Sequence, residues 1–334
     1  MNKNLFSFIL SFFVISMALA QTTRIVCNIP TYNNSVTNSV IYTNLQTCID
    51  ASSAGDIIIV QGSSTSYGNI VVAKPLILLG PGYFLVQNPN TQAQFNIATL
   101  GSVQFNSGSI GSLLKGFVVS SSISLTTTSV IIQNNSCNSS IYLTNTNNCI
   151  IKQNYCNGIY ANVSPYTNNS NLMIQNNILL SDVYTSTATI TNNFFNGVSS
   201  YWIFTGCLIK NNIFAASGLS TTPTNNAFLN NIITNNTFGT GSTNGNVIVA
   251  NIDNVFLGYP TQGAYSFDGR YQLKSGSPAI SAGDDNLDCG PFGGSEPYRL
   301  SGIGFNPNIY SVTMPSSGTS QGGLSVRVLI SANQ

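Results

Sequence analysis

Apolar and polar positions alternate in a short phrase that occurs six times between residues 130 and 238. The first apolar position is Ile in every copy: Ile132, Ile151, Ile174, Ile190, Ile209 and Ile233. The second holds Cys137, Cys156, Leu179, Phe195, Phe214 and Phe238. The residue after each Ile is polar, and this period of two predicts a β-strand with one buried face. Apolar residues in the same columns of every copy predict a shared core between stacked repeats.

One asparagine lies between the two apolar positions of each copy. These residues are Asn135, Asn154, Asn177, Asn193, Asn212 and Asn236. Asparagine tolerates the left-handed backbone region and bonds to nearby backbone groups, so this column predicts a buried turn. In coils stacked about 4.8 Å apart, each amide can also bond the amides above and below it. We therefore predict a structural asparagine ladder, with ligand binding by these amides as the alternative.

The spacing of the copies indicates a solenoid. Measured on the asparagine, the spacings are 19, 23, 16, 19 and 24 residues. A constant core with variable spacing is typical of coils whose loops differ in length. Residues 114–118 fit as a preceding coil, with Gly116 at the asparagine position. The pattern predicts an all-β fold, a single-stranded parallel β-helix, which we expect to be right-handed because parallel crossovers almost always are.

A short helix is predicted at the N-terminal end of the solenoid. Thr43 or Asn44 can cap a helix that places Leu45, Cys48 and Ile49 on one apolar face. Such a helix would cover the strand edge that the first coil leaves unpaired.

Both ends of the chain carry further segments with distinct composition. Lys3, the apolar residues 5–15 and the small residues 18–20 are typical of a cleavable signal peptide. Near the other end, the apolar residues 309–314 and 324–330 flank a Ser/Gly-rich turn and predict a β-hairpin that caps the solenoid or docks another molecule. The expected organisation is a signal peptide at 1–20, an N-terminal cap and first strand at 21–60, the parallel β-helix at 61–300 and the C-terminal tail at 301–334.

Composition narrows the function classes. Only 6% of residues are charged, the net charge is +1 and there is no His, so no basic surface for nucleic acid is predicted. No segment after the signal peptide is long and apolar enough to span a bilayer.

Seven cysteines leave at least one unpaired; Cys27 and Cys48 are the better candidate pair. Cys137 and Cys156 share a column, and we interpret them as small buried hydrophobic residues, with a disulfide as the alternative. A zinc site is not expected without His or closely spaced Cys pairs.

Two regions of the chain, each with two characteristic phrases, resemble a known family. The segments LQTCIDASSAGDIIIVQG and YGNIVVAKPLILLGPGYFL, residues 45–62 and 67–85, resemble the opening of secreted right-handed parallel β-helix proteins of the pectin-lyase-like type. The phrases YQLKSGSPAISAG and DCGPFGG resemble the closing coil of exported bacterial members, especially from Bacteroidetes, where the position of Cys289 is more often aliphatic. The resemblance spans nearly the whole mature chain and implies the fold, export and a buried Cys289. It does not imply an activity, because the superfamily includes lyases, hydrolases and non-catalytic proteins.

Acidic residues are too sparse for the enzymes of this fold. Its lyases hold calcium with several carboxylates and use Arg or Lys as a base, and its glycosidases need two or three acidic groups close together. Between Asp56 and Asp182 the chain has no acid, and through the repeats it has only Asp182 and Asp253. Lys152 and Lys210 share an outward column and are interpreted as solvated, with a base or an anchor for an acidic sugar as the alternative.

Two further groups are candidate binding sites. Asp284, Asp285 and Asp288 lie in a Gly-containing loop that could hold calcium, although they fit no EF-hand pattern and can equally cap turn amides. Aromatic residues next to the loops between coils are the candidate carbohydrate-binding residues, with packing over the coil surface as the alternative: Tyr155, Tyr160, Tyr184, Tyr201 and Trp202, together with Tyr166.

These patterns predict an exported, non-catalytic β-helix protein that is secreted or located at the cell surface. An extracellular or surface polysaccharide is the expected partner, with no nucleic acid and no cofactor unless calcium binds. A polysaccharide lyase or glycoside hydrolase with an atypical active site is the alternative. A self-assembling or ice-facing solenoid ranks lower, because Thr-rich runs such as residues 126–128 do not form regular columns.

Overall fold

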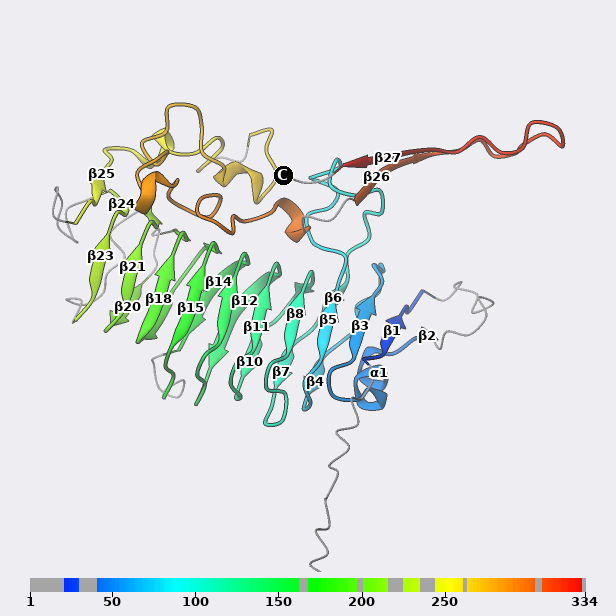
Figure 1. The fold of residues 1–334 in the computed structure, drawn as a ribbon, viewed down its shortest axis with the longest axis horizontal. Coiled ribbons are helices and arrows are strands. Elements are labelled where there is room, and N and C mark those ends of the chain that lie inside the picture. The colour runs from blue at the N-terminus through cyan, green and yellow to red at the C-terminus, as the bar shows by residue number, and fades with distance from the viewer. Residues whose placement is uncertain are drawn as a thin grey trace, which may run out of the picture.

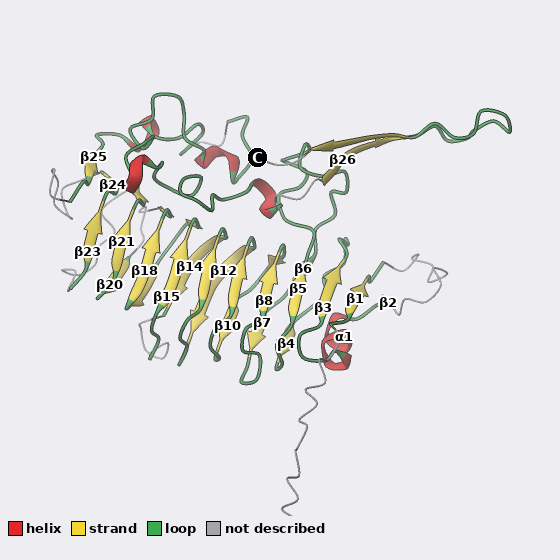
Figure 2. Ribbon diagram, viewed as in Figure 1, coloured by secondary structure: helices red, strands yellow, loops and turns green. Residues whose placement is uncertain are grey.

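The structure, a computed structural model, describes residues 21–29, 41–161, 168–196, 201–215, 225–234, 244–260, 263–303 and 308–331. The chain winds into stacked coils, and all strand pairs within the solenoid are parallel (Figures 1 and 2). The fold is therefore a parallel β-helix, as the sequence predicts. A regular coil contributes three strand segments, which define three faces of the solenoid.

Face 1 is an eleven-stranded sheet. Its Ile column stands in register, with Ile132 opposite Ile151 and Ile151 opposite Ile174, and these side chains are fully buried. In spatial order the strands are β2 (Ile41–Tyr42), β1 (Thr23–Val26), β3 (Ile57–Val60), β5 (Ile77–Leu79), β8 (Leu113–Lys115), β11 (Ile131–Gln133), β13 (Ile150–Lys152), β15 (Leu172–Gln175), β18 (Ala188–Thr191), β21 (Leu208–Lys210) and β23 (Ala227–Leu229).

Faces 2 and 3 belong to one fourteen-stranded sheet, because two long strands, β12 (Ser136–Leu143) and β14 (Tyr155–Tyr160), run from one face to the other. The other strands of face 2 are β6 (Thr99–Leu100), β9 (Val118–Val119), β16 (Ile178–Leu179), β19 (Phe194–Phe195), β22 (Ile213–Phe214), β24 (Ile232–Ile233) and β25 (Val247–Ile248). The other strands of face 3 are β4 (Ile70–Val72), β7 (Val103–Phe105), β10 (Ile123–Leu125), β17 (Val183–Ser186) and β20 (Trp202–Thr205).

The corner between faces 1 and 2 needs one left-handed residue in each coil. The residues with φ between 53° and 58° here are Asn134, Gln153, Asn176, Asn192, Asn211 and Asn230. Each directly precedes a predicted ladder asparagine or its equivalent, so the expectation that the ladder asparagine itself is left-handed was wrong. Gly116, with φ of 84°, occupies the same corner one coil earlier, because Lys115 pairs with Gln133. The position expected for Gly116 is held by Phe117.

The asparagine after each corner joins a continuous row of buried hydrogen bonds. The Oδ1 of Asn154 accepts from the backbone N–H of Asn135 at 3.0 Å and from its Nδ2 at 3.2 Å. The same pair of bonds links Asn154 to Asn177, Asn177 to Asn193 and Asn193 to Asn212. Each Nδ2 also donates to a carbonyl of face 1, such as Ile151 O for Asn177. These amides are therefore almost fully hydrogen-bonded although no water reaches them.

The sixth copy of the phrase is out of register with the sequence alignment. Asn212 bonds to Asn231, and Phe228 lies opposite Ile209. Phe228 therefore holds the place predicted for Ile233, and Asn231 holds the place predicted for Asn236. The error arose because the sixth copy has Phe at the Ile position, whereas Ile232 and Ile233 follow it on face 2. The row continues to Asn246, and Asn236 itself lies outside the described residues.

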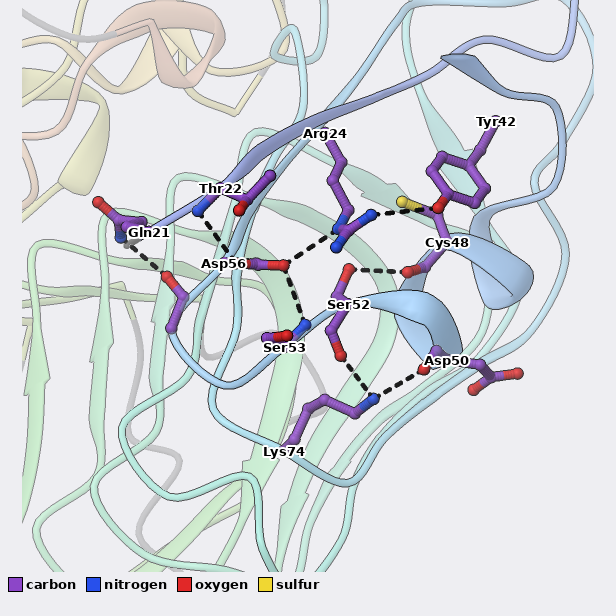
Figure 3. A network of polar contacts seen from close by, with 11 residues as sticks. Gln21, Thr22, Arg24, Tyr42, Cys48, Asp50, Ser52, Ser53, Asp56 and Lys74 are labelled. Atoms are coloured by element: carbon purple, nitrogen blue, oxygen red, sulfur yellow. Dashed lines mark hydrogen bonds and ion pairs between the residues drawn. The ribbon is translucent and has the colours of Figure 1, made fainter. Parts of the chain in front are cut away.

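The N-terminal end is closed by helix α1 (Leu45–Ala51), which buries Leu45, Cys48 and Ile49 as predicted. Asn44 caps it by accepting from the backbone N–H of Thr47 at 2.9 Å. Figure 3 shows the polar network that ties this cap to the first coils. At its centre the buried Asp56 carboxylate accepts from Arg24 Nε and from the N–H groups of Thr22 and Ser53. Burial opposes ionisation, but these bonds outweigh it and lower the pKa of Asp56.

Residues 252–260 and 263–303 form a strap that runs back along the solenoid over face 2 (Figure 1). It contains the 3-10 turns η1 (Ile252–Asn254), η2 (Gly269–Tyr271), η3 (Asp284–Asn286) and η4 (Leu300–Gly302). We expected the β-helix to extend to residue 300, but the strands of the solenoid end at β25. The strap covers outward side chains of face 2, Ile178, Phe194, Ile213 and Ile232, which are all fully buried. An apolar outward column needs such a cover.

The tail forms an antiparallel hairpin of β26 (Asn308–Thr313) and β27 (Arg327–Ser331), which confirms the prediction with a shorter second strand. The hairpin projects from the N-terminal half of the solenoid, where Ala93 N donates to Ile309 O (Figure 1). All seven cysteines are buried and unpaired, so the structure does not contain the candidate disulfide between Cys27 and Cys48. Within the described ranges, no helix has the length and apolar character needed to cross a membrane.

Candidate functional site

Three tyrosines form a row on the outside of face 3. Tyr142 of β12 lies opposite Tyr160 of β14, which lies opposite Tyr184 of β17. The alternation of each strand turns the preceding residue, Ile141 or Ile159, into the core and the tyrosine outward. The rings of Tyr142 and Tyr160 are stacked with centroids 5.2 Å apart, and those of Tyr160 and Tyr184 are tilted at 5.1 Å. All three rings are half-buried, with part of each exposed to solvent.

The Asp182 carboxylate organises one end of this row. Its Oδ2 accepts from the hydroxyls of Tyr160 at 3.1 Å and Tyr184 at 3.4 Å. Its Oδ1 accepts from the backbone N–H of Tyr201 at 2.8 Å, and the Tyr201 side chain is 56% exposed. A single carboxylate therefore links three tyrosines that come from three successive coils.

Gly158 allows Asp182 to lie this close to β14. A Cβ at residue 158 would meet the carbonyl oxygen of Asp182 at 2.3 Å, which is far inside van der Waals contact. The same carbonyl accepts from Ile159 N at 3.0 Å, so the two coils are joined at this point. We define the tyrosine face as Tyr142, Tyr160, Tyr184, Tyr201 and Asp182.

Two phenols of the tyrosine face, Tyr160 and Tyr184, are held in their neutral form. Partial burial raises the pKa of Tyr160 and of Tyr184, and the Asp182 charge raises both further. A neutral phenol can donate to the carboxylate, whereas a phenolate would be repelled by it. The face therefore presents ring edges, hydroxyls and one anionic acceptor to solvent.

The structure brings together some of the aromatic residues that the sequence singled out and separates others. Tyr160, Tyr184 and Tyr201 meet at Asp182. Trp202 was expected near the surface but is fully buried, packed against Phe195 and Phe214, because the alternation of β20 turns it into the core. Tyr155 lies under the strap, with its ring against Phe84 at 5.0 Å, and Tyr166 lies outside the described residues.

Tyr142 and Asp182 were missed as members of this site. The signal for Tyr142 is a second repeated phrase, which places Ile or Val before Tyr in residues 141–142, 159–160 and 183–184. Asp182 was treated as an isolated acid because no second acid lies nearby in sequence. Its partners are phenols, which a search for paired carboxylates does not find.

Two carboxylates of the acidic loop are bonded to groups of the chain itself. Asp284 pairs with Lys210 at 2.9 Å, and Asp288 accepts from the backbone N–H of Ser281. In the part of the chain that the structure describes, which includes all three aspartates, no group of three or more His, Cys, Asp or Glu side chains could hold a metal ion. The lysine interpreted as solvated at position 152 instead pairs with Glu296 at 2.8 Å.

A cavity of about 470 Å³ lies beside face 2, under the loop of residues 84–97. Its lining includes Phe84, Phe95 and Val118 together with Thr99 and Asn138, and no charged side chain is among them. It therefore offers no acid or base for catalysis, although its size falls in the range of small-molecule pockets.

The chain was compared with known proteins. No protein-family model matches the sequence, and no curated protein matches it. The structure is similar to a solved structure described as the crystal structure of pectate lyase Pel9A, with a TM-score of 0.33 and 10% sequence identity. The match covers 82% of this chain and 97% of that chain. The assignment as a parallel β-helix rests on the strand pairing within this chain.

Proposed function

We propose that this protein is an exported, non-catalytic β-helix protein that binds neutral glycans through its tyrosine face. The observation that carries the proposal is the register of Tyr142, Tyr160 and Tyr184 on three successive coils, with Asp182 joining two of their hydroxyls. A row along the solenoid axis suits a linear polymer, which can contact one ring after another.

The chemistry of the tyrosine face suits a glycan. A sugar ring presents apolar C–H groups and hydroxyls side by side, and tyrosine combines an aromatic ring with a polar hydroxyl. A carboxylate accepts strong hydrogen bonds from sugar hydroxyls because the acceptor is charged. The charge on Asp182 is negative and would repel an acidic sugar, so neutral glycans are favoured on this face.

The distribution of acids supports binding without catalysis. Glycoside hydrolysis needs two carboxyl groups on opposite sides of one bond, about 5 to 9.5 Å apart. Of the nine acids in the chain, only Asp182 belongs to the coils between β4 and β25; Asp50 and Asp56 lie in the N-terminal cap, and the others lie in the strap. The hydrogen bonds of Asp182 come from two phenols and an amide, which are not a general acid–base pair at neutral pH.

The sequence of residues 1–20 supports export, because it combines a basic start, an apolar stretch and small residues before Gln21. An extracellular or cell-surface location would bring the tyrosine face into contact with polysaccharides.

The test is the binding of the mature chain to a panel of soluble neutral and acidic polysaccharides. We expect binding to at least one neutral glycan and at least about tenfold weaker binding by the double variant Tyr160→Ala/Tyr184→Ala. The matched control is Tyr265→Ala, which removes a tyrosine that is 40% exposed on the strap. Thermal unfolding of each variant checks that the fold is retained.

Two outcomes would contradict the proposal. Equal binding by the wild type and a folded double variant would remove the tyrosine face as the site. Release of new chain ends from any polysaccharide would show catalysis, and Asp182→Asn would then be the first variant to assay for activity.

A further inference from the structure

Three lysines share one outward column of face 1. Lys115 and Lys152 both lie opposite Gln133, and Lys210 follows further along the same column. The strap brings a carboxylate to two of these lysines. Glu296 Oε2 lies 2.8 Å from Lys152 Nζ, and Asp284 Oδ2 lies 2.9 Å from Lys210 Nζ. Lys115 is the third member of the column, and within the described residues it forms no ion pair.

A pocket lies where a carboxylate partner for Lys115 would be expected. It has a volume of about 250 Å³, and its walls are Lys115, the backbone of Gly80 and Gly116, Gln92, and the end of the strap at Gly302 and Ile303. All nine acidic residues of the chain lie in the described part of the structure, and none of them lines this pocket. No acidic side chain of the protein therefore supplies a counter-charge here.

A buried side-chain amide without a hydrogen-bond acceptor lies next to this pocket. The corner side chains of Gln153, Asn176 and Asn192 each donate to strap carbonyls. Asn134 is the equivalent residue one coil earlier, it is 2% exposed, and its Nδ2 has no hydrogen-bond partner among the described residues. Its carbonyl accepts from Gly116 N, which places Asn134 directly behind the wall of the pocket. A buried donor without an acceptor costs free energy, and the strap supplies no described acceptor at this coil, unlike at the next three.

We propose that the Lys115 pocket is a binding site for the oxyanion group of a small acidic ligand, which takes the place that the strap carboxylates hold at Lys152 and Lys210. The volume of the pocket suits one carboxylate or sulfate group with the sugar-sized unit that carries it. A carboxylate from a sugar acid and a sulfate from a sulfate ester share this chemistry. The site is separate from the tyrosine face, and its test does not depend on glycan binding there.

The electrostatics of the pocket agree with this assignment. Burial lowers the pKa of Lys115, and the nearby charge of Lys152 lowers it further. A bound anion would stabilise the ammonium form and raise this pKa again.

The test follows the side-chain resonances of Lys115 by NMR in protein labelled at lysine. The probes are glucuronate, glucose as its neutral counterpart, and inorganic sulfate, each titrated into the mature chain to millimolar concentration. We expect glucuronate to shift the Lys115 signals with saturation, glucose to leave them unchanged, and Lys115→Gln to weaken glucuronate binding at least about tenfold. Saturation by sulfate as well would assign the site to oxyanions generally, and glucuronate alone would assign it to carboxylates.

Arg327→Gln is the matched control, since it removes the same charge from the exposed hairpin. It should bind glucuronate as the wild type does. The proposal is overturned if neither anion shifts Lys115 in the wild type, a result that needs no variant to fold. Equal responses to glucose and glucuronate, or an unchanged affinity in folded Lys115→Gln, would also overturn it.

Discussion

Adjacent polar residues at each corner of the solenoid have different roles. The left-handed residue, such as Asn176, turns its side chain outward and donates to the strap carbonyls of Pro291 and Gly293. The next residue, Asn177, turns inward and bonds the asparagines of the two neighbouring coils. One Asn-Asn pair therefore closes the corner, fixes the distance between coils and holds the cover of face 2.

The inward asparagine should be the costlier one to lose. In Asn177→Leu, both the N–H and the Nδ2 of Asn154 lose their acceptor, and the carbonyl of Ile151 loses a donor. We expect a loss of about 2–4 kcal/mol in the free energy of unfolding, because each buried group left unpaired costs about 1–3 kcal/mol. Chemical denaturation measures this loss. Asn138→Leu, at an exposed position, is the control, and equal stability of the two variants would contradict the structural role of the row.

Lys115 predicts a pH dependence of stability. Its pKa is lowered in the folded state, so the unfolded chain binds its proton more tightly. This lysine therefore destabilises the fold at neutral pH, and the effect fades as the pH rises from the lowered pKa through the ordinary lysine pKa. We expect Lys115→Gln to unfold at a higher temperature than the wild type at pH 7 without ligand, and the difference to vanish near pH 11. A variant that is less stable at pH 7 would contradict this sign.

At the scale of the elements, the polar contacts that hold the strap are of two kinds, exposed ion pairs and buried amide bonds, and the amide bonds should contribute more. The ion pairs of the strap involve Glu296 and Asp284, which are about half exposed, and exposed pairs contribute about 0–1 kcal/mol. The two bonds from the Asn176 amide are buried. Between these bonds the strap packs apolar side chains such as Phe256 and Tyr271 against Phe194 of face 2.

We therefore expect Asn176→Gly to loosen the strap more than Glu296→Gln does. Glycine accepts the positive φ of this corner and removes only the side chain, so the substitution isolates the strap contact. Hydrogen exchange of the amides in residues 288–293 should accelerate several-fold in Asn176→Gly and little in Glu296→Gln. The reverse order would show that charge, not buried amide bonding, holds the strap.

Local patterns in the sequence predicted the coils, but contacts between distant segments were not predictable. The Ile and Asn columns were sufficient for the parallel β-helix and for face 1, and the Asn44 cap was sufficient for helix α1. The register predicted for the sixth copy was wrong because Phe228 replaces Ile at the position that defines the repeat. The strap was missed because an apolar outward residue such as Phe194 has the same local pattern as an inward one. In the candidate site, Tyr160 and Tyr184 were among the aromatic residues singled out from the sequence. Tyr201 and Trp202 are adjacent aromatics, so the sequence could not indicate which of them strand β20 turns into the core, and Trp202 is the buried one.

At the scale of the molecule, a solenoid buries each coil against its neighbours and must cover whatever apolar surface remains. Helix α1 covers one end, whereas the strap covers the length of face 2 (Figure 1). The hairpin β26–β27 covers neither, and its side chains Ile309, Val312 and Ile330 are about half exposed or more. The C-terminal 83 residues therefore contain one segment that the fold needs and one that it does not need for its core.

Two truncations separate these segments. Removing residues 308–334 should leave the unfolding temperature within a few degrees of the wild type, because among the described residues one backbone hydrogen bond, from Ala93 N to Ile309 O, joins the hairpin to the body. Removing residues 252–334 should expose Ile178, Phe194, Ile213 and Ile232, each worth about 1.5–3 kcal/mol when buried. The longer truncation should bind a hydrophobic dye and self-associate, as an exposed apolar surface of this size does. A truncated protein that stays monomeric and as stable as the wild type would show that the coils fold without the strap. The strap would then serve ligand binding and not stability.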